Sequence, residues 1–101
     1  MSQQIKINIS HKQLNEFCQR NHITKLALFG SVLRDDFKAE SDIDVLVEFE
    51  PDCIPGLAFF EMEAELSQIF GRKVDLNTLG FLSPKIREQV QQEAVVQYVK
   101  S

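Results

Sequence analysis

The sequence predicts a small α/β (α+β) fold in which a mixed sheet of three to four strands is covered by helices. Apolar residues recur at helical spacing in three separate segments, short alternating or continuous apolar runs lie between them, and turn-forming residues divide the segments. A chain of 101 residues with 44% hydrophobic content leaves too little sequence for a second core. We therefore expect residues 1–101 to form a single domain.

Two elements are expected before the first glycine of the chain. Ser10 followed three residues later by Gln13 is a capping-box pattern, and the apolar residues after it recur at helical spacing, which predicts a helix over residues 11–20. Residues 25–29 form a short apolar run that ends at Gly30. Such a run is typical of a buried strand that opens into a turn, and we expect a further helix to begin at this turn.

Residues 42–49 alternate between the two faces of a predicted strand. Side chains of alternate strand residues point to the same side of a sheet. One face is apolar and is expected to lie in the core, and it consists of Ile43, Val45, Val47 and Phe49. The other face begins with two acids, and it consists of Asp42, Asp44, Leu46 and Glu48.

The next segments predict a long helix and a third strand. Apolar residues recur at helical spacing over residues 59–70, and Gly71 supplies the C-terminal stop of this helix. The phenylalanines of this helix are expected in the core, with the alternative that Phe59 or Phe60 lies at a protein interface. Residues 73–77 alternate and predict a strand whose polar face again carries an acid, Asp75.

The end of the chain predicts a last helix and a closing strand. Ser83 and Pro84 form the pattern of an N-cap followed by proline at the first helical position. The inward face of this helix is expected to consist of Ile86, Val90 and Ala94. Residues 95–99 are rich in valine and tyrosine and permit a short closing strand.

Composition excludes several kinds of partner and location. The net charge is −4 and the eleven Lys and Arg residues are scattered, which argues against stable binding to long nucleic acid. No apolar run approaches the roughly 18 residues that a membrane span needs, and the N-terminus lacks a basic region followed by an apolar stretch, so we expect a cytoplasmic protein. Cys18 and Cys53 have no metal-ligand spacing around them and are expected to be unpaired thiols.

The segment with chemical content is Gly30-Ser31, then ten residues, then Asp42-Ile43-Asp44. The carboxylates of Asp42 and Asp44 leave the predicted strand on one side, with Cα atoms roughly 7 Å apart. Two acids this close repel each other, and a hard divalent cation with oxygen ligands is the usual physical reason for such an arrangement. The sequence therefore predicts a Mg²⁺ site.

The turn before these acids is suited to bind phosphate. Gly30 lets the backbone approach a phosphate closely, and Ser31 can present both its N–H and its hydroxyl at the start of the predicted helix. Arg34, one turn along, could reach the same phosphates. Asp75 could complete the metal site or accept the proton of an attacking hydroxyl.

Each of these residues also has a simpler interpretation. The Gly-Ser pair could be a plain turn with an N-cap, the paired acids could be solvated residues of an edge strand, and Asp75 could be an exposed strand residue. Arg34 could equally be a surface arginine paired with Asp35 or Asp36. His11 and His22 lack a partner at metal-ligand spacing and receive no role.

The combination resembles the nucleotidyltransferase superfamily related to DNA polymerase β, whose signature is Gly-Ser, about ten residues, then Asp-x-Asp, with a third acid on a later strand. The matching residues are Gly30, Ser31, Asp42, Asp44 and, on the later strand, Asp75. A closer resemblance, to the minimal nucleotidyltransferase (MNT) antitoxins, extends from about residue 10 to the end. It is carried by residues 28–34, 41–49, 71–76, 82–84, 86–87 and 93–95, while Asp35 stands where many relatives carry glycine.

The resemblance implies the polymerase β-like nucleotidyltransferase fold and Mg²⁺-dependent transfer of AMP from ATP. The implied acceptor is a tyrosine hydroxyl of a partner HEPN-family RNase toxin, which the transfer silences, so that the chain acts as an antitoxin. The implied catalytic and metal-binding residues are Asp42, Asp44 and Asp75, and the implied nucleotide-binding residues are Gly30, Ser31 and Arg34.

Two other functions remain open at this point. A catalytically idle antitoxin would neutralise its toxin by binding alone, and a nucleotidyltransferase could instead modify the hydroxyl of a small molecule such as an aminoglycoside. Retention of both aspartates and of the Gly-Ser pair disfavours the idle antitoxin. A chain this short has little surface left to enclose a small acceptor, so we expect the acceptor surface to come from another chain.

Overall fold

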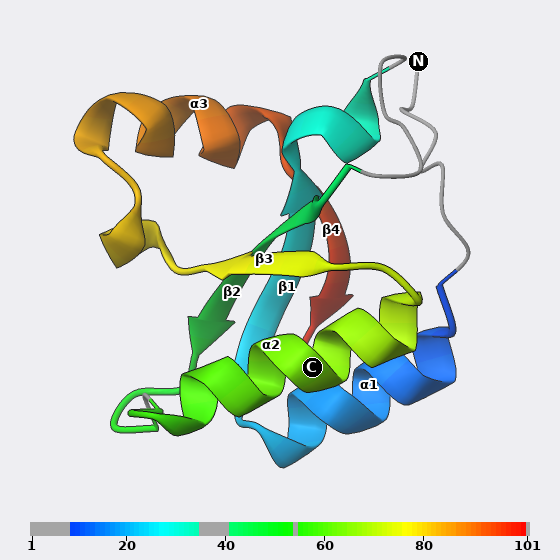
Figure 1. Cartoon of the computed structure of the whole chain (residues 1–101). Coiled ribbons are helices and arrows are strands. Elements are labelled where there is room, and N and C mark those ends of the chain that lie inside the picture. Colours follow the sequence, from blue (N-terminus) through cyan, green and yellow to red (C-terminus); the bar gives the residue numbers. More distant parts are fainter. Residues whose placement is uncertain (1–8, 35–40, 54, 101) are drawn as a thin grey trace.

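Three helices and four strands make up the structure, a computed structural model that describes residues 9–34, 41–53 and 55–100. The strands form one mixed sheet in the order β3-β2-β1-β4, in which β2 and β3 are parallel and the other two pairs are antiparallel (Figure 1). This confirms the predicted fold class. The elements in chain order are α1 (His11–Arg20), β1 (Ile23–Phe29), the 3₁₀ turn η1 (Gly30–Leu33), β2 (Ile43–Phe49), α2 (Ala58–Phe70), β3 (Val74–Asn77), the 3₁₀ turn η2 (Leu79–Phe81), α3 (Pro84–Glu93) and β4 (Val95–Val99).

The main core lies between one face of the sheet and the helices α1 and α2, which run side by side (Figure 1). The apolar face predicted for β2 lies in this core, where three of its four side chains are buried and Phe49 packs against them half-buried. Burying side chains of this size contributes about 1.5–3 kcal/mol each. The fully buried members contributed by the two helices and the central strand include Leu14, Phe17, Leu26, Leu28 and Leu66.

A smaller core lies on the other face of the sheet, under α3. It consists of Phe29, Leu46 and Val90. Leu46 belongs to the face that was predicted to be polar, and it is buried because the end of α3 covers this part of the sheet. The prediction that Ile86 faces inward is wrong: its side chain is 50% exposed because the start of α3 lies away from the strands (Figure 1).

Helix α2 protects the edge of the sheet at β3. The N–H of Val74 donates to the Ser67 hydroxyl at 3.0 Å, and the N–H of Leu76 donates to the Glu63 carboxylate at 2.9 Å. These two N–H groups point away from β2. Without their partners on α2 they would be unpaired donors at the edge of the sheet. Because Val74 and Leu76 are buried against α2, the residue between them, Asp75, faces the other side of the sheet.

The helix boundaries follow the sequence signals closely. The Ser10 hydroxyl accepts a hydrogen bond from the N–H of Gln13 at 3.4 Å at the start of α1, and Gly71 ends α2 in the left-handed conformation at φ 69°. Ser83 and Pro84 occupy the N-cap and first helical position of α3 as predicted. Among the described residues, none of the helices has both the length and the apolar content that crossing a membrane requires.

Candidate functional site

The candidate site begins where β1 ends, at Gly30. Its backbone has φ +77°, a conformation that residues with a Cβ rarely adopt. A Cβ at this position would overlap the Oδ2 atom of Asp44 and lie 3.1 Å from its Cγ atom. Phe29 and Asp44 are paired in the antiparallel register of β1 and β2, which fixes this approach. Glycine is therefore required here so that the Asp44 carboxylate can lie directly against the turn.

The acids Asp44 and Asp75 lie side by side on adjacent strands. They are partners in the parallel register of β2 and β3, and Asp75 is one of the neighbours that raise the pKa of Asp44. Asp44 is half-buried while Asp75 is exposed. The structure thus brings two of the three acids side by side, on the face of the sheet opposite α1 and α2.

The pKa of Asp44 is raised from 3.8 to about 6 in the folded protein. Burial of the carboxyl group is the largest cause, followed by the negative charges of Asp75 and Asp42, and the positive charge of Arg34 opposes them. The influence of Asp42 and Arg34 on this pKa places both close to Asp44. Around Asp44 the effect of the negative charges therefore exceeds that of the positive charge of Arg34.

The donors present fit a Mg²⁺ ion that arrives with its own ligands. Within the described part of the chain, no three His, Cys, Asp or Glu side chains are already arranged as a metal site. Mg²⁺ seldom uses such a cage, because it keeps several waters and binds through one or two carboxylates together with phosphate oxygens. Asp42 and Asp44 are the two carboxylates that could serve, since they lie on the open side of the sheet and their mutual repulsion raises the pKa of Asp44.

Arg34 is held by a residue that the sequence did not single out. Its Nη2 atom lies 3.9 Å from Oε1 of Glu93 at the end of α3. The alternative partners, Asp35 and Asp36, lie outside the described residues. In the same way, Nζ of Lys73 lies 3.9 Å from Oδ2 of Asp42. Both ion pairs join residues that are far apart in the sequence, so no local pattern could have indicated them.

Ser31 lies in η1, and the prediction that a helix begins here is wrong, since only a short 3₁₀ turn follows Gly30. The segment is a 3₁₀ turn of four residues, closed by the Arg34 N–H, which donates to the Ser31 carbonyl at 2.9 Å. The chain leaves the turn at Arg34 in an extended conformation, φ −117° and ψ 162°, after Val32 has been fully buried in the main core. A phosphate at this turn would be bound by the first N–H groups and the Ser31 hydroxyl, without the dipole of a long helix.

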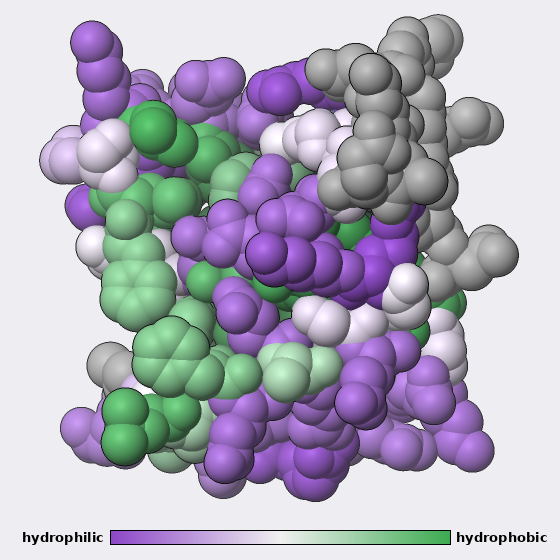
Figure 2. Space-filling model, viewed as in Figure 1, coloured by the Kyte–Doolittle hydropathy of each residue, from purple (hydrophilic) through white to green (hydrophobic). Residues whose placement is uncertain are grey.

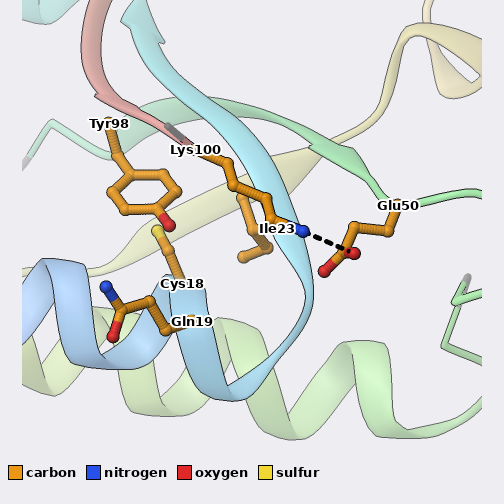
Figure 3. A pocket seen from close by; sticks show the side chains of 6 residues that line it. All are labelled: Cys18, Gln19, Ile23, Glu50, Tyr98 and Lys100. Carbon is orange, nitrogen blue, oxygen red and sulfur yellow. Dashed lines mark hydrogen bonds and ion pairs between the residues drawn. The ribbon is translucent and has the colours of Figure 1, made fainter.

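A separate hollow lies at the opposite end of the strands (Figure 3). It opens where β1 begins and β2 ends, whereas Gly30 and Asp44 lie where β1 ends and β2 begins. Its polar contact is an ion pair of 2.7 Å between Lys100 and Glu50. The hollow is lined by Cys18, Gln19, Ile23, Glu50, Tyr98 and Lys100. It shares no residue with the acid cluster and is not part of the candidate site.

Comparison with known proteins identifies the family of the chain. Residues 11–97 match the family model described as the nucleotidyltransferase domain. The protein adenylyltransferase MntA of Thermococcus cleftensis is 37% identical over 87 residues, which cover 85% of this chain and 84% of that protein.

Two solved toxin–antitoxin structures have the same fold. A crystal structure of a toxin–antitoxin with AMP-PNP matches with a TM-score of 0.72 at 22% identity, over 92% of this chain and 76% of the matched chain. A complex of a tri-AMPylated HEPN toxin from Shewanella oneidensis with an MNT antitoxin matches with a TM-score of 0.64 at 23% identity, over 89% of this chain and 70% of the matched chain.

Proposed function

Since the chain belongs to the nucleotidyltransferase domain family, as one of its minimal nucleotidyltransferase antitoxins, we propose that it transfers AMP from ATP to a tyrosine hydroxyl of a HEPN-family toxin. The observation that carries the proposal is the contact between three parts of the signature. Asp44 lies against the turn at Gly30 and is paired with Asp75 in the register of β2 and β3. This gathers a phosphate-binding turn and a pair of acids at one point of the sheet.

The acids and the turn have distinct roles in this proposal. A bound Mg²⁺ would neutralise charge on the triphosphate and polarise its α-phosphorus. Asp42 and Asp44 would hold that ion, and the N–H groups at Gly30 and Ser31 would orient the phosphates. The acceptor oxygen then bonds to the α-phosphorus while the bond to the β-phosphate breaks and pyrophosphate leaves. These groups are fixed before the nucleotide arrives, which is the usual source of catalytic advantage in phosphoryl chemistry.

Two further side chains complete the proposed site. The Arg34 guanidinium, directed by Glu93, lies close enough to Asp44 to affect its pKa and is placed to donate to a phosphate oxygen. In this proposal Asp75, the more exposed of the two acids paired across β2 and β3, accepts the proton of the acceptor hydroxyl. If Asp75 instead helps to hold the cation, the proton must leave to solvent.

A protein acceptor suits this chain better than a small molecule. The site lies at the β3 edge of a four-stranded sheet, where the described residues do not enclose a small acceptor on all sides. The relatives described above include one named a protein adenylyltransferase and one in complex with an AMPylated HEPN toxin. A toxin of that family is therefore the partner we propose.

The experiment that tests the proposal combines transfer with binding. The protein is mixed with ATP, Mg²⁺ and the protein encoded by the neighbouring gene, and the mass of that protein is measured. We expect added mass equal to one or more AMP groups, lost when Asp42 and Asp44 are replaced by Asn and retained in the control Val99→Ala, whose exposed side chain lies on the distant strand β4.

The same experiment separates the competing functions. A stable complex with no added mass would mean that the chain acts by binding alone. In a parallel reaction that also contains an aminoglycoside, added mass on the aminoglycoside but not on the neighbouring protein would identify a small-molecule nucleotidyltransferase. Either result would contradict transfer of AMP to a protein tyrosine.

A further inference from the structure

Asp75 is brought beside Asp44 by a strand of only four residues. Within the described part of the chain, β3 (Val74–Asn77) is an edge strand whose one neighbouring strand is β2. β3 lies beside α2 on the near side of Figure 1, and Figure 2 shows hydrophilic side chains over this part of the surface. A short edge strand is weakly held by its own ladder, and a shift by one residue would turn Asp75 to the opposite face.

Two side chains of α2 hold the outer side of β3. The Ser67 hydroxyl accepts from the Val74 N–H at 3.0 Å, and the Glu63 carboxylate accepts from the Leu76 N–H at 2.9 Å. The Ser67 hydroxyl also donates to the Glu63 carbonyl at 2.8 Å, which directs its proton to the helix and leaves its lone pairs to accept. The two bonds therefore lie on either side of Asp75 along the strand.

The spacing of the two acceptors matches the spacing of the two donors. Glu63 and Ser67 are about one turn apart on α2, which is about 6 Å along a helix. Val74 and Leu76 are two residues apart on β3, which is about 6.6 Å along a strand. A shift of β3 by one residue would break both bonds, because successive N–H groups of a strand point in opposite directions. Helix α2 therefore fixes the register in which Asp75 is paired with its partner on β2.

We propose that Glu63 and Ser67 are positioning residues for the transfer reaction, which keep Asp75 beside Asp44. This inference rests on the proposed function, because it assumes that Asp75 takes part in the transfer. Both side chains act from the α2 side of β3, whereas the Asp75 side chain faces the other side of the sheet. Glu63 gives the sharper test, since its bond needs an oxygen acceptor, which Glu63→Gln retains and Glu63→Ala removes.

The first readout is hydrogen exchange of single backbone amides, followed by NMR in the protein without metal or nucleotide. In Glu63→Ala we expect the Leu76 amide to exchange roughly tenfold faster than in the wild type, because its hydrogen bond to a charged acceptor is lost. Glu63→Gln should stay within about twofold of the wild type. Glu61→Ala is the matched control, because it removes a carboxylate from an exposed position of the same helix and should leave this amide unchanged.

The second readout is the kcat of AMP transfer to the neighbouring protein. It is expressed per ATP-binding site counted by calorimetry with Mg²⁺, so that unfolded protein does not contribute. We expect Glu63→Ala to lower kcat roughly tenfold through misplacement of the proton acceptor, and Glu63→Gln to restore it to within about twofold of the wild type. The KM for ATP should change by less than about twofold, because the turn at Gly30 and the acids of β2 lie on other elements.

A double-mutant cycle separates positioning from a general effect on stability. In a protein that already carries Asp75→Asn, Glu63→Ala should lower kcat by less than about twofold, because the group that it positions is already gone. A residue that only stabilises the fold would lower kcat by the same factor in both backgrounds.

The inference would be overturned by unchanged exchange of the Leu76 amide in Glu63→Ala, by fast exchange with unchanged kcat, or by equal losses of kcat in the two backgrounds. Failure of the proposed function has a different appearance. The wild type would then transfer no AMP to the neighbouring protein, although its Leu76 amide remains protected from exchange.

Discussion

Replacing Asp44 by Asn should make the metal-free protein more stable at neutral pH, although it removes a residue of the proposed site. The folded protein raises the pKa of this carboxyl from 3.8 to about 6, chiefly through burial and the neighbouring acids. A raised carboxyl pKa contributes stability that is fully present below pH 3.8 and is lost as the pH rises through about 6. Above that pH the charged Asp44 therefore destabilises the fold.

The expected magnitude follows from the shift in pKa. Two pKa units correspond to about 3 kcal/mol, and because Asp44 is only half-buried, solvent screening reduces this to roughly 1–2 kcal/mol. Asp44→Asn retains the shape of the side chain and removes its charge. For a domain of this size we expect the urea midpoint to rise by about 1 M at pH 7.5 in the presence of EDTA.

The assay is urea unfolding of wild type and variant between pH 4 and pH 7.5, each with EDTA and with Mg²⁺. The difference should vanish near pH 4 and grow through pH 6, and Mg²⁺ with ATP should stabilise the wild type but not the variant. Asp52→Asn is the matched control, since it removes the same charge from an exposed turn. A variant no more stable than the wild type at pH 7.5 without metal would refute the reasoning.

Two further predictions concern the turn and the buried thiol. Gly30→Ala should destabilise the fold by about 1–3 kcal/mol and abolish binding of ATP with Mg²⁺, as measured by calorimetry, because its Cβ would displace the Asp44 carboxylate. Gly71→Ala has a similar positive φ with open space around it, so it should cost about 1 kcal/mol and leave nucleotide binding intact; equal effects of the two changes on binding would count against the Gly30 contact. Cys18 is fully buried and burial raises its pKa to about 12, so in the native protein iodoacetamide at pH 8 should modify Cys53 and spare Cys18. Mass spectrometry of the peptides checks this, and rapid modification of Cys18 would contradict the packing of α1 against the sheet.

The elements could be predicted because their signals are local. The cap at Ser10, the stop at Gly71 and the proline at position 84 each mark a helix boundary within a few residues, and the structure confirms all three. The alternation along residues 43–49 likewise assigned the core face of β2. The sequence could also predict that Asp44 and Asp75 lie near each other, because each acid was assigned to a predicted strand, on the face that carries polar residues.

The remaining features depend on contacts between distant parts of the chain. Leu46 is buried and Ile86 is exposed because α3 covers only part of the face of the sheet opposite α1 and α2. The hydrophobic periodicity of the sequence does not specify how much of that face α3 covers. The 3₁₀ turn after Gly30 is short because Val32 reaches the core and the chain then extends at Arg34. The contact with Glu93 depends on where α3 ends in space.

The most direct measurement is a crystal structure of this protein with Mg²⁺ and an ATP analogue whose bond between the α- and β-phosphates cannot be cleaved. We expect the triphosphate at the turn of Gly30 and Ser31, with the cation between its oxygens and the carboxylates of Asp42 and Asp44. A triphosphate bound in the hollow beside Tyr98, or a cation that touches neither aspartate, would contradict the account.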